Sequence, residues 1–479
     1  MSDSRPDDKA GAGSSSPDFE VSSRARISLS LIGLLHGLTL GSRLPVLPLF
    51  ARRTLHYSWQ QTSMVLAGLA AGIVAAPVLM QIGRRLKLDA RLGLAGSHLC
   101  AGGLIMAMAW WRQSGTETPR VPAPLIATIC AAAYSIAIGP AMRWMPQVAR
   151  DVFPQPGMPG SRMWRLWAAV GFVLPAWISE TVLIGLPQLR GSVASLDALL
   201  MFAGWGGLLT AVVALLTRGA ATSTEESRAS LLADETSRPP MMGAGFLLAI
   251  LFLVIVQKCH HLWTAPYFEE VARRDGVSSP LVHRLVVVSQ VFEVLGLYLM
   301  AGTGMLKAHR VRLLLLLASS AWVGRSLLLS WLESAPPDSP LLNSTPMGVA
   351  FVSQALFASQ ALYGLGLAGF LGALGTLLHH STRPAGGLWT AVLLGAATGF
   401  GVLFGGVLAE TLVSGNRSTI LAPHLRTLSE RIQTGSLSMR GWSGVWLLSA
   451  APATLAALFL LICRLPGPRD SGESDPRAV

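Results

Sequence analysis

The chain has 479 residues, of which 51% are hydrophobic and 13% charged, with a formal net charge of +12 and a mean hydropathy of +0.51. A soluble domain carries about 25% charged residues, and a disordered chain is poor in apolar residues, so this composition excludes both classes for most of the length. The basic excess matches the loops of a membrane protein and its contact with anionic lipid, and we expect no nucleic-acid partner.

Apolar stretches of about 20 residues recur along the chain, and each is long enough to cross a hydrocarbon core of about 30 Å as a helix. We predict an all-α membrane protein with twelve transmembrane helices in two six-helix bundles. The predicted spans are 27–50, 62–83, 92–111, 122–146, 163–188, 197–217, 243–268, 281–306, 311–333, 346–380, 386–414 and 442–464.

The polar segments divide the chain into domains. We predict a disordered cytoplasmic tail at 1–26, an N-terminal bundle at 27–217, a cytoplasmic linker at 218–242, a C-terminal bundle at 243–464 and a second tail at 465–479. The tail at 1–26 lacks a signal-peptide pattern. A basic segment at 415–441 has apolar residues at helical spacing, which is compatible with a short helix on the membrane surface.

Lys and Arg concentrate in the loops on the side that would hold both termini, for example Arg85, Lys87 and Arg91. The positive-inside rule therefore predicts that both termini are cytoplasmic in a multi-pass protein of the plasma membrane, specifically a bacterial inner membrane. No G-x-x-x-x-G-K-[ST] motif occurs, so an ion gradient is the expected energy source.

Several charged residues fall inside the predicted spans. A charge at the bilayer centre costs roughly 2.5–3.5 kcal/mol on the insertion scale, so each should face a cavity or a partner. Snorkelling or local pairing near a span end would satisfy four of them, whereas Arg325, in the middle of its span, fits a structural ion pair as well as a ligand contact. The full set is Arg43, Arg165, Lys258, Arg284, Arg325, Glu180, Glu293 and Glu410.

Glu293 is the strongest candidate for proton coupling. It lies at the centre of its span, and Gln290 shares its helix face. A desolvated carboxylate there can gain or release a proton as a neighbouring cation or the substrate changes. The alternative is a permanent salt bridge between Glu293 and Lys258 or Arg165.

Span 243–268 contains Gln257, Lys258, Cys259, His260 and His261 in succession. Adjacent helix positions point about 100° apart and cannot easily chelate one ion together, so we favour a polar cavity lining over a metal site. The four cysteines all fall in apolar segments without CxxC spacing, which indicates core residues.

Several short segments resemble the nucleoside:proton symporters of the major facilitator superfamily, the bacterial nucleoside permease type. The resemblance rests on their order and spacing along most of 27–464. The segments are Arg165-Leu-Trp with Gly171-Phe172, Ser289-Gln290-Val-Phe-Glu293, Ala321-Trp-Val-Gly-Arg325, Leu362-Tyr363-Gly, Gly399-Phe-Gly with Gly405-Gly-Val, and Val445-Trp446.

The resemblance implies a central cavity for nucleosides in which Arg165, Phe172, Gln290, Glu293 and Tyr363 match substrate-site positions. In this interpretation Arg165 orients substrate and tunes Glu293, Gln290 donates a hydrogen bond, and the two aromatic rings stack on the substrate.

The chain departs from the family pattern at several positions. Ala169 replaces a hydroxyl residue, Lys258 and His261 replace an amide-bearing pair, and Leu367 and Ala368 replace an aromatic residue and an acid. The loop after the second span keeps Arg84 and Arg85 but lacks the Asp of the superfamily's G-x-x-x-D-[RK] pattern. Lys258 and His261 are therefore added as candidate lining residues, and such a pocket favours a more anionic ligand.

The sequence thus predicts a secondary active transporter, with proton-coupled uptake of nucleosides or a related polar ring compound by alternating access. We expect a monomer with a small-molecule substrate and membrane lipid as partners, no cofactor, no metal and no enzymatic activity. An exporter of drugs or metabolites and a non-transporting receptor remain alternatives. The sequence leaves open the solute, the direction, the coupling ion, H⁺ or Na⁺, and the role of 415–441.

Overall fold

A computed structural model describes most of the chain. The described residues are 23–42, 47–113, 121–152, 164–175, 192–217, 244–275, 279–307, 310–334, 346–380, 384–415, 423–424 and 441–462. Every regular element among them is helical. The predicted tail at 465–479, the linker at 218–242 and most of 415–441 lie outside the described residues.

The N-terminal half is built from α-helices and one short π-helical turn. Pro77 and Pro146 lie inside α4 and α7, where each removes one backbone hydrogen bond. In chain order its elements are α1 (Ser23–Gly41), α2 (Leu47–Leu49), η1 (Phe50–Thr54), α3 (Trp59–Gly68), α4 (Ala70–Arg85), α5 (Ala90–Gln113), α6 (Pro124–Ile138), α7 (Ala141–Val152), a helix over 164–175, and α9 (Ser192–Leu216).

The described residues of the C-terminal half form six long helices, and each corresponds to one predicted span. They are α11 (Ala244–Asp275), α12 (Ser279–Gly302), α13 (Val311–Ser334), α14 (Pro346–His380), α15 (Pro384–Leu412) and α17 (Gly441–Ile462).

The hydropathy of the helices confirms the predicted class, an all-α membrane protein. Among the described residues, 8 helices are long and apolar enough to cross a membrane, and two shorter apolar helices lie at Leu200–Leu216 and Val287–Gly302. The first predicted span, 27–50, differs in detail because α1 already begins at Ser23 and ends at Gly41, and α2 starts a separate element at Leu47. α1, in the first predicted span, is not among these helices, and more than half of the fifth span, 163–188, lies outside the described residues, so the count of twelve stays a prediction.

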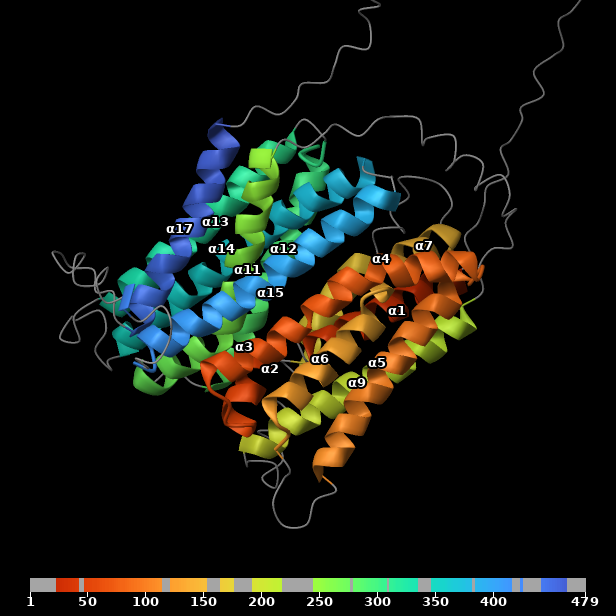
Figure 1. Ribbon diagram of the computed structural model, residues 1–479, viewed down its shortest axis with the longest axis horizontal. Helices are drawn as coiled ribbons and strands as arrows, with labels where there is room; N and C mark the ends of the chain where they lie inside the picture. The colour runs from red at the N-terminus through yellow and green to blue at the C-terminus, as the bar shows by residue number, and fades with distance from the viewer. Residues whose placement is uncertain are drawn as a thin grey trace, which may run out of the picture.

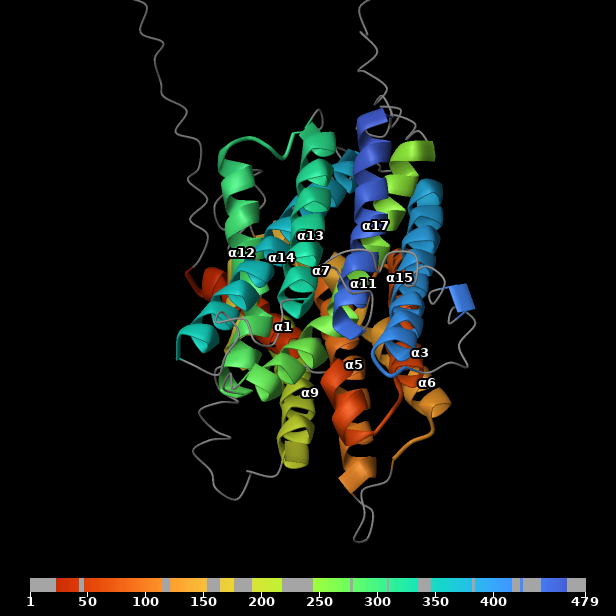
Figure 2. The ribbon, with the colours of Figure 1, turned by 90° about the vertical axis from the view of Figure 1, so that its left-hand side faces the viewer.

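The helices form two bundles that lie side by side (Figure 1). In the N-terminal bundle α9 packs on α5 and α1, while α6 packs on α3, α4 and α5. In the C-terminal bundle α13 packs on α14 and α17, α12 on α14, and α11 on α15 and α17. Figure 2 shows these C-terminal helices standing next to one another from the side.

The two bundles meet mainly along α15, which packs on both α3 and α4. Small residues permit this approach, because a Cβ atom on Gly406 would lie 2.2 Å from Ser63 Oγ and one on Gly395 would lie 2.4 Å from a Val74 methyl carbon. At the start of α3, the Trp59 backbone N–H donates to Glu410 Oε2 at 2.8 Å. A carboxylate of one half therefore caps a helix of the other half.

Glycines on one face of α1 bring it into backbone contact with the helix over 164–175. Gly33, Gly37 and Gly41 recur at intervals of one helical turn. A Cβ atom at Gly37 would lie 1.8 Å from the Ala168 carbonyl oxygen, and one at Gly171 would lie 1.9 Å from that of Leu34. Small residues at such spacing allow transmembrane helices to pack closely.

We expect Gly37→Ala to destabilise the N-terminal half by about 2–3 kcal/mol, because the added methyl group must push two helix backbones apart. Thermal unfolding in detergent would measure the effect. Gly96→Ala is the matched control, since nothing lies within 4 Å of a Cβ atom at Gly96. An equal melting temperature for the two variants would contradict the close packing.

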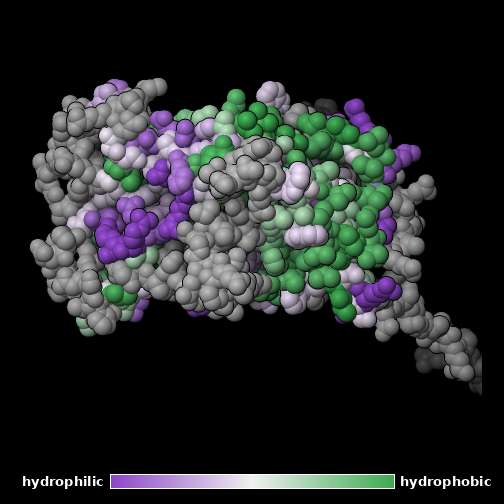
Figure 3. Space-filling view, turned by 90° about the horizontal axis from the view of Figure 1, so that it is seen from below, coloured by the Kyte–Doolittle hydropathy of each residue, from purple (hydrophilic) through white to green (hydrophobic). Residues whose placement is uncertain are grey.

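The outer surface of the bundles is apolar. Trp110, Leu216, Tyr298 and Ile462 are each more than 70% exposed. In Figure 3 hydrophobic residues cover a broad area of the half that holds the N-terminal bundle, with hydrophilic residues at its margins. An apolar patch of this extent is suited to lipid contact, as expected of a multi-pass membrane protein.

Candidate functional site

Glu293 and Gln290 occupy one turn of α12 in the interior of the C-terminal half. Glu293 is 8% exposed, and Gln290 Nε2 donates a hydrogen bond to Glu293 Oε2. Among the described residues no ion pair joins Glu293 to Lys258 or Arg165, so the permanent salt bridge considered above is not found. The carboxylate is thus held by a neutral partner.

Close packing of α12 on α14 brings Tyr363 next to this turn. A Cβ atom at Gly364 would lie 2.1 Å from the Ser289 carbonyl oxygen, so only glycine permits the contact. Glu293 lies within electrostatic range of Tyr363. Three of the predicted site residues, Gln290, Glu293 and Tyr363, are therefore brought together by two adjacent helices.

Lys258 and His261 come from the middle of α11. They are three positions apart and share a helix face, and they lie within electrostatic range of each other. Both side chains are partly exposed although they lie far from either end of the helix. This position suits groups that line an internal space.

The two predicted residues of the N-terminal half lie on the helix over 164–175. Arg165 is exposed, and its guanidinium carbon lies 5.5 Å from the centre of the Trp164 ring. Phe172 is partly exposed, and its backbone packs on Gly41 of α1. No ion pair between Arg165 and Glu293 occurs among the described residues, and the tuning of this carboxylate by Arg165 stays a prediction.

Arg325 of α13 is fully buried between aromatic rings of the C-terminal half. Its guanidinium carbon lies 4.5 Å from the Tyr363 ring centre and 5.2 Å from the Trp446 ring centre, and Nη2 donates to Thr264 Oγ1 at 2.7 Å. Such cation–π contacts are stronger away from water. Sequence analysis selected Arg325 and Tyr363 and quoted Trp446 only as part of the Val445-Trp446 segment. It missed Thr264, because no charge or motif distinguishes that residue.

His260 belongs to the same buried region. Its Nε2 atom lies 3.1 Å from Ser326 Oγ and 3.2 Å from Ser449 Oγ, and the two serine hydroxyls are 2.9 Å apart. The Cys259 thiol instead donates to the Gly401 carbonyl at 3.1 Å. Neighbouring residues of α11 thus point to different partners, and no group of three metal-ligating side chains occurs in the described part of the chain.

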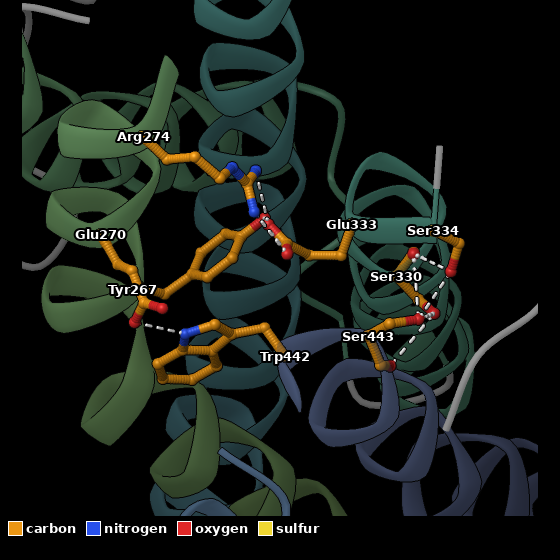
Figure 4. A network of polar contacts seen from close by, with 8 residues as sticks. All are labelled: Tyr267, Glu270, Arg274, Ser330, Glu333, Ser334, Trp442 and Ser443. Carbon is orange, nitrogen blue, oxygen red and sulfur yellow. Dashed lines mark hydrogen bonds and ion pairs between the residues drawn. The ribbon is translucent and has the colours of Figure 1, made fainter. Parts of the chain in front are cut away.

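A polar network ties together α11, α13 and α17 where α11 ends and α17 begins (Figure 4). The Arg274 guanidinium and the Tyr267 hydroxyl both donate to Glu333, at 2.8 and 3.0 Å. Trp442 Nε1 donates to Glu270 at 2.7 Å. The network fixes the end of the C-terminal half that meets α3.

Charged residues of the N-terminal half reach the same end. Arg53 forms an ion pair with Glu269, and the Arg52 guanidinium lies 4.6 Å from the Trp59 ring centre. Burial lowers the pKa of Arg52, whereas the carboxylates of Glu410 and Glu270 act in the opposite direction. The two halves are therefore joined at this end by charge as well as by packing.

Comparison with known proteins identifies the fold. No family model matches the chain, and no curated protein matches it. The solved nucleoside transporter NupG is similar in structure, with a TM-score of 0.61, 16% identity, and coverage of 91% of this chain and 98% of that chain. The chain has the major facilitator fold.

Other solved transporters are similar to the chain in structure as well. A bacterial homologue of the human lysosomal transporter Spinster, in an inward-facing and unoccupied conformation, has a TM-score of 0.56, 14% identity, and coverage of 93% of this chain and 95% of that one. A structure from work on proton-dependent oligopeptide transporters has a TM-score of 0.59 at 13% identity, covering 91% of this chain and 97% of its own. At such identities the likeness establishes the fold alone.

Proposed function

We propose that the protein is a secondary active transporter that takes up nucleosides or related polar ring compounds together with protons, by alternating access. The observation that carries the proposal is the group formed by Gln290, Glu293 and Tyr363, in which a buried carboxylate has a neutral hydrogen-bond partner and no paired cation among the described residues. A carboxylate inside a membrane protein is a proton-relay candidate by default.

The residues assigned to the substrate have distinct roles in this proposal. Glu293 carries the proton, Gln290 donates to a polar edge of the ring, and Tyr363 and Phe172 stack on it. Lys258 and His261 line the route, since both are partly exposed in the middle of α11. Arg165, exposed on the N-terminal half, would orient substrate only in a conformation that brings the halves closer.

The contacts between the two halves at one end of the molecule support alternating access. The packing of Gly406 of α15 on α3, the ion pair between Arg53 and Glu269, and the cap from Glu410 join the halves at the end where α3 begins. Further along the same interface, α15 packs on α4. The predicted orientation makes this the outer side. Transport would require these contacts to separate and form again while the site opens to each side in turn.

Uptake measurements test this function. Purified protein in sealed proteoliposomes would receive radiolabelled uridine or adenosine, with and without an inward proton gradient, and with a sodium gradient as a separate arm. We expect accumulation driven by the proton gradient and abolished by a protonophore. An inward sodium gradient that drives accumulation alone would replace the proposed coupling ion.

Other outcomes would point to the alternatives. Binding of uridine without accumulation in sealed vesicles would indicate a receptor. Resistance of cells to toxic compounds, with no uptake of nucleosides, would indicate an exporter. We expect neither, and we expect the protein to act as a monomer in the bacterial inner membrane, with no cofactor.

A further inference from the structure

Arg325 lies in a buried cluster of polar and aromatic residues to which the proposed function assigns no role. We call it the Arg325 centre. It consists of Arg325, His260, Thr264 and Trp446, together with Gln360, which shares a face of α14 with Tyr363, the residue three positions further on. Arg325, His260 and Gln360 are 0% exposed. The members come from α11, α13, α14 and α17, so the centre is formed by four helices of the C-terminal half.

Polar atoms of the Arg325 centre lack hydrogen-bond partners among the described residues. They include Nε and Nη1 of Arg325, Nδ1 of His260, Nε1 of Trp446 and both amide atoms of Gln360. The guanidinium and indole N–H groups can only donate. A buried donor without an acceptor costs about 1–3 kcal/mol, and more when it is charged, so several together favour a ligand that accepts hydrogen bonds.

The positive charges that form no ion pair among the described residues of the C-terminal half indicate that the ligand of this centre is an anion. An arginine cannot be deprotonated in a protein, and removing its counter-charge from a buried site is strongly destabilising. The ion pairs found among the described residues involve Glu269, Glu333 and Asp89, which all lie near helix ends. Glu293 is hydrogen-bonded to Gln290, and no carboxylate among the described residues forms an ion pair with Arg325 or Lys258.

The side chain of Tyr363 separates Arg325 from the candidate lining residues Lys258 and His261. The Tyr363 ring covers its guanidinium, and the Tyr363 hydroxyl is 3.4 Å from the Gln257 carbonyl oxygen, a long and weak hydrogen bond. Gln257, Lys258 and His261 are partly exposed. A rotation of Tyr363 would therefore connect Arg325 with the space that these residues line.

We propose that the Arg325 centre binds the acidic group of the transported compound, a carboxylate or a phosphate, while the ring of that compound lies near Tyr363 and Gln290. This inference rests on the proposed function and narrows its substrate class to polar ring compounds that carry an acidic group. The planar guanidinium can donate two parallel hydrogen bonds to either group, and Gln360 and Trp446 supply further donors.

Ligand-induced thermal stabilisation of the purified protein tests the proposal. The probes are orotate, which bears a carboxylate, uridine monophosphate, which bears a phosphate, neutral uridine, and inorganic phosphate. We expect one of the two acidic ring compounds to bind at least about tenfold more tightly than uridine, because charge-assisted hydrogen bonds are the strong ones. Inorganic phosphate, which lacks a ring, should bind more weakly than either.

Substitutions in the Arg325 centre test whether the acidic compound binds there. Arg325→Gln should weaken binding of the acidic compound at least about tenfold and lower binding of uridine by a smaller factor, while Arg325→Lys should lose less, since it keeps the charge. Arg312→Gln is the matched control on the same helix, because Arg312 donates to the Leu461 carbonyl at one end of α13. Gln360→Leu should weaken the same compound without a change of charge, and it serves as a second variant if Arg325→Gln fails to fold.

The outcomes separate the inference from the proposed function. Gradient-driven uptake of uridine with no binding of either acidic compound would overturn the inference and leave the function intact. Binding of an acidic compound that neither Arg325→Gln nor Gln360→Leu weakens would also overturn it. Folded protein that neither binds nor accumulates any of the ring compounds would refute both.

Discussion

Glu293→Gln is expected to abolish the accumulation of uridine driven by a proton gradient. The amide keeps the shape of the side chain but cannot ionise, so binding and release of a proton can no longer alternate with binding of substrate. We expect accumulation to fall to the level of vesicles without protein. Exchange of internal for external uridine should persist, because exchange needs no net proton movement.

Two assays separate coupling from folding. Uridine counterflow in the same vesicles would show that Glu293→Gln protein is intact and binds substrate. Glu270→Gln is the matched control, since a glutamine there can still accept the hydrogen bond from Trp442 Nε1. Full proton-driven accumulation by Glu293→Gln would exclude Glu293 as the coupling group.

Hydropathy was sufficient to predict an all-helical membrane protein, because the cost of unpaired backbone groups in lipid allows few alternatives. The predicted bounds fall within a few residues for α5, α13 and α14. The end of α1 at Gly41, inside the predicted span 27–50, was missed, because the sequence stays apolar beyond it and mean hydropathy does not register the end of a helix.

The site was only partly predictable. Gln290 and Glu293 are close along the sequence and share a helix face, so their contact follows from helical spacing. The cover of Arg325 by Tyr363 and Trp446 depends on the packing of three separate helices, and a single sequence does not determine that packing.

Gly406→Ala is expected to weaken closure between the two halves and to slow transport. A Cβ atom at this position would lie 2.4 Å from Ser63 Cβ and 2.9 Å from the Trp59 carbonyl oxygen, so α15 could no longer approach α3 as closely. Overpacking costs about 1–3 kcal/mol, which lowers the closed population about 5- to 150-fold relative to the open one. Because the clash lies between the halves, each bundle should still fold.

Labelling of Thr62→Cys with a membrane-impermeant thiol reagent would report the closure. Thr62 is 0% exposed in α3, so its replacement should react slowly while the halves are closed and faster when Gly406→Ala is added. Gly399→Ala is the matched control on α15, since a Cβ atom there would be 3.8 Å from Ala70 Cβ, an ordinary contact. Equal labelling and uptake rates in the two glycine variants would mean that the contact between α3 and α15 does not limit closure, and the moving contact would then have to be sought between α2 and α11.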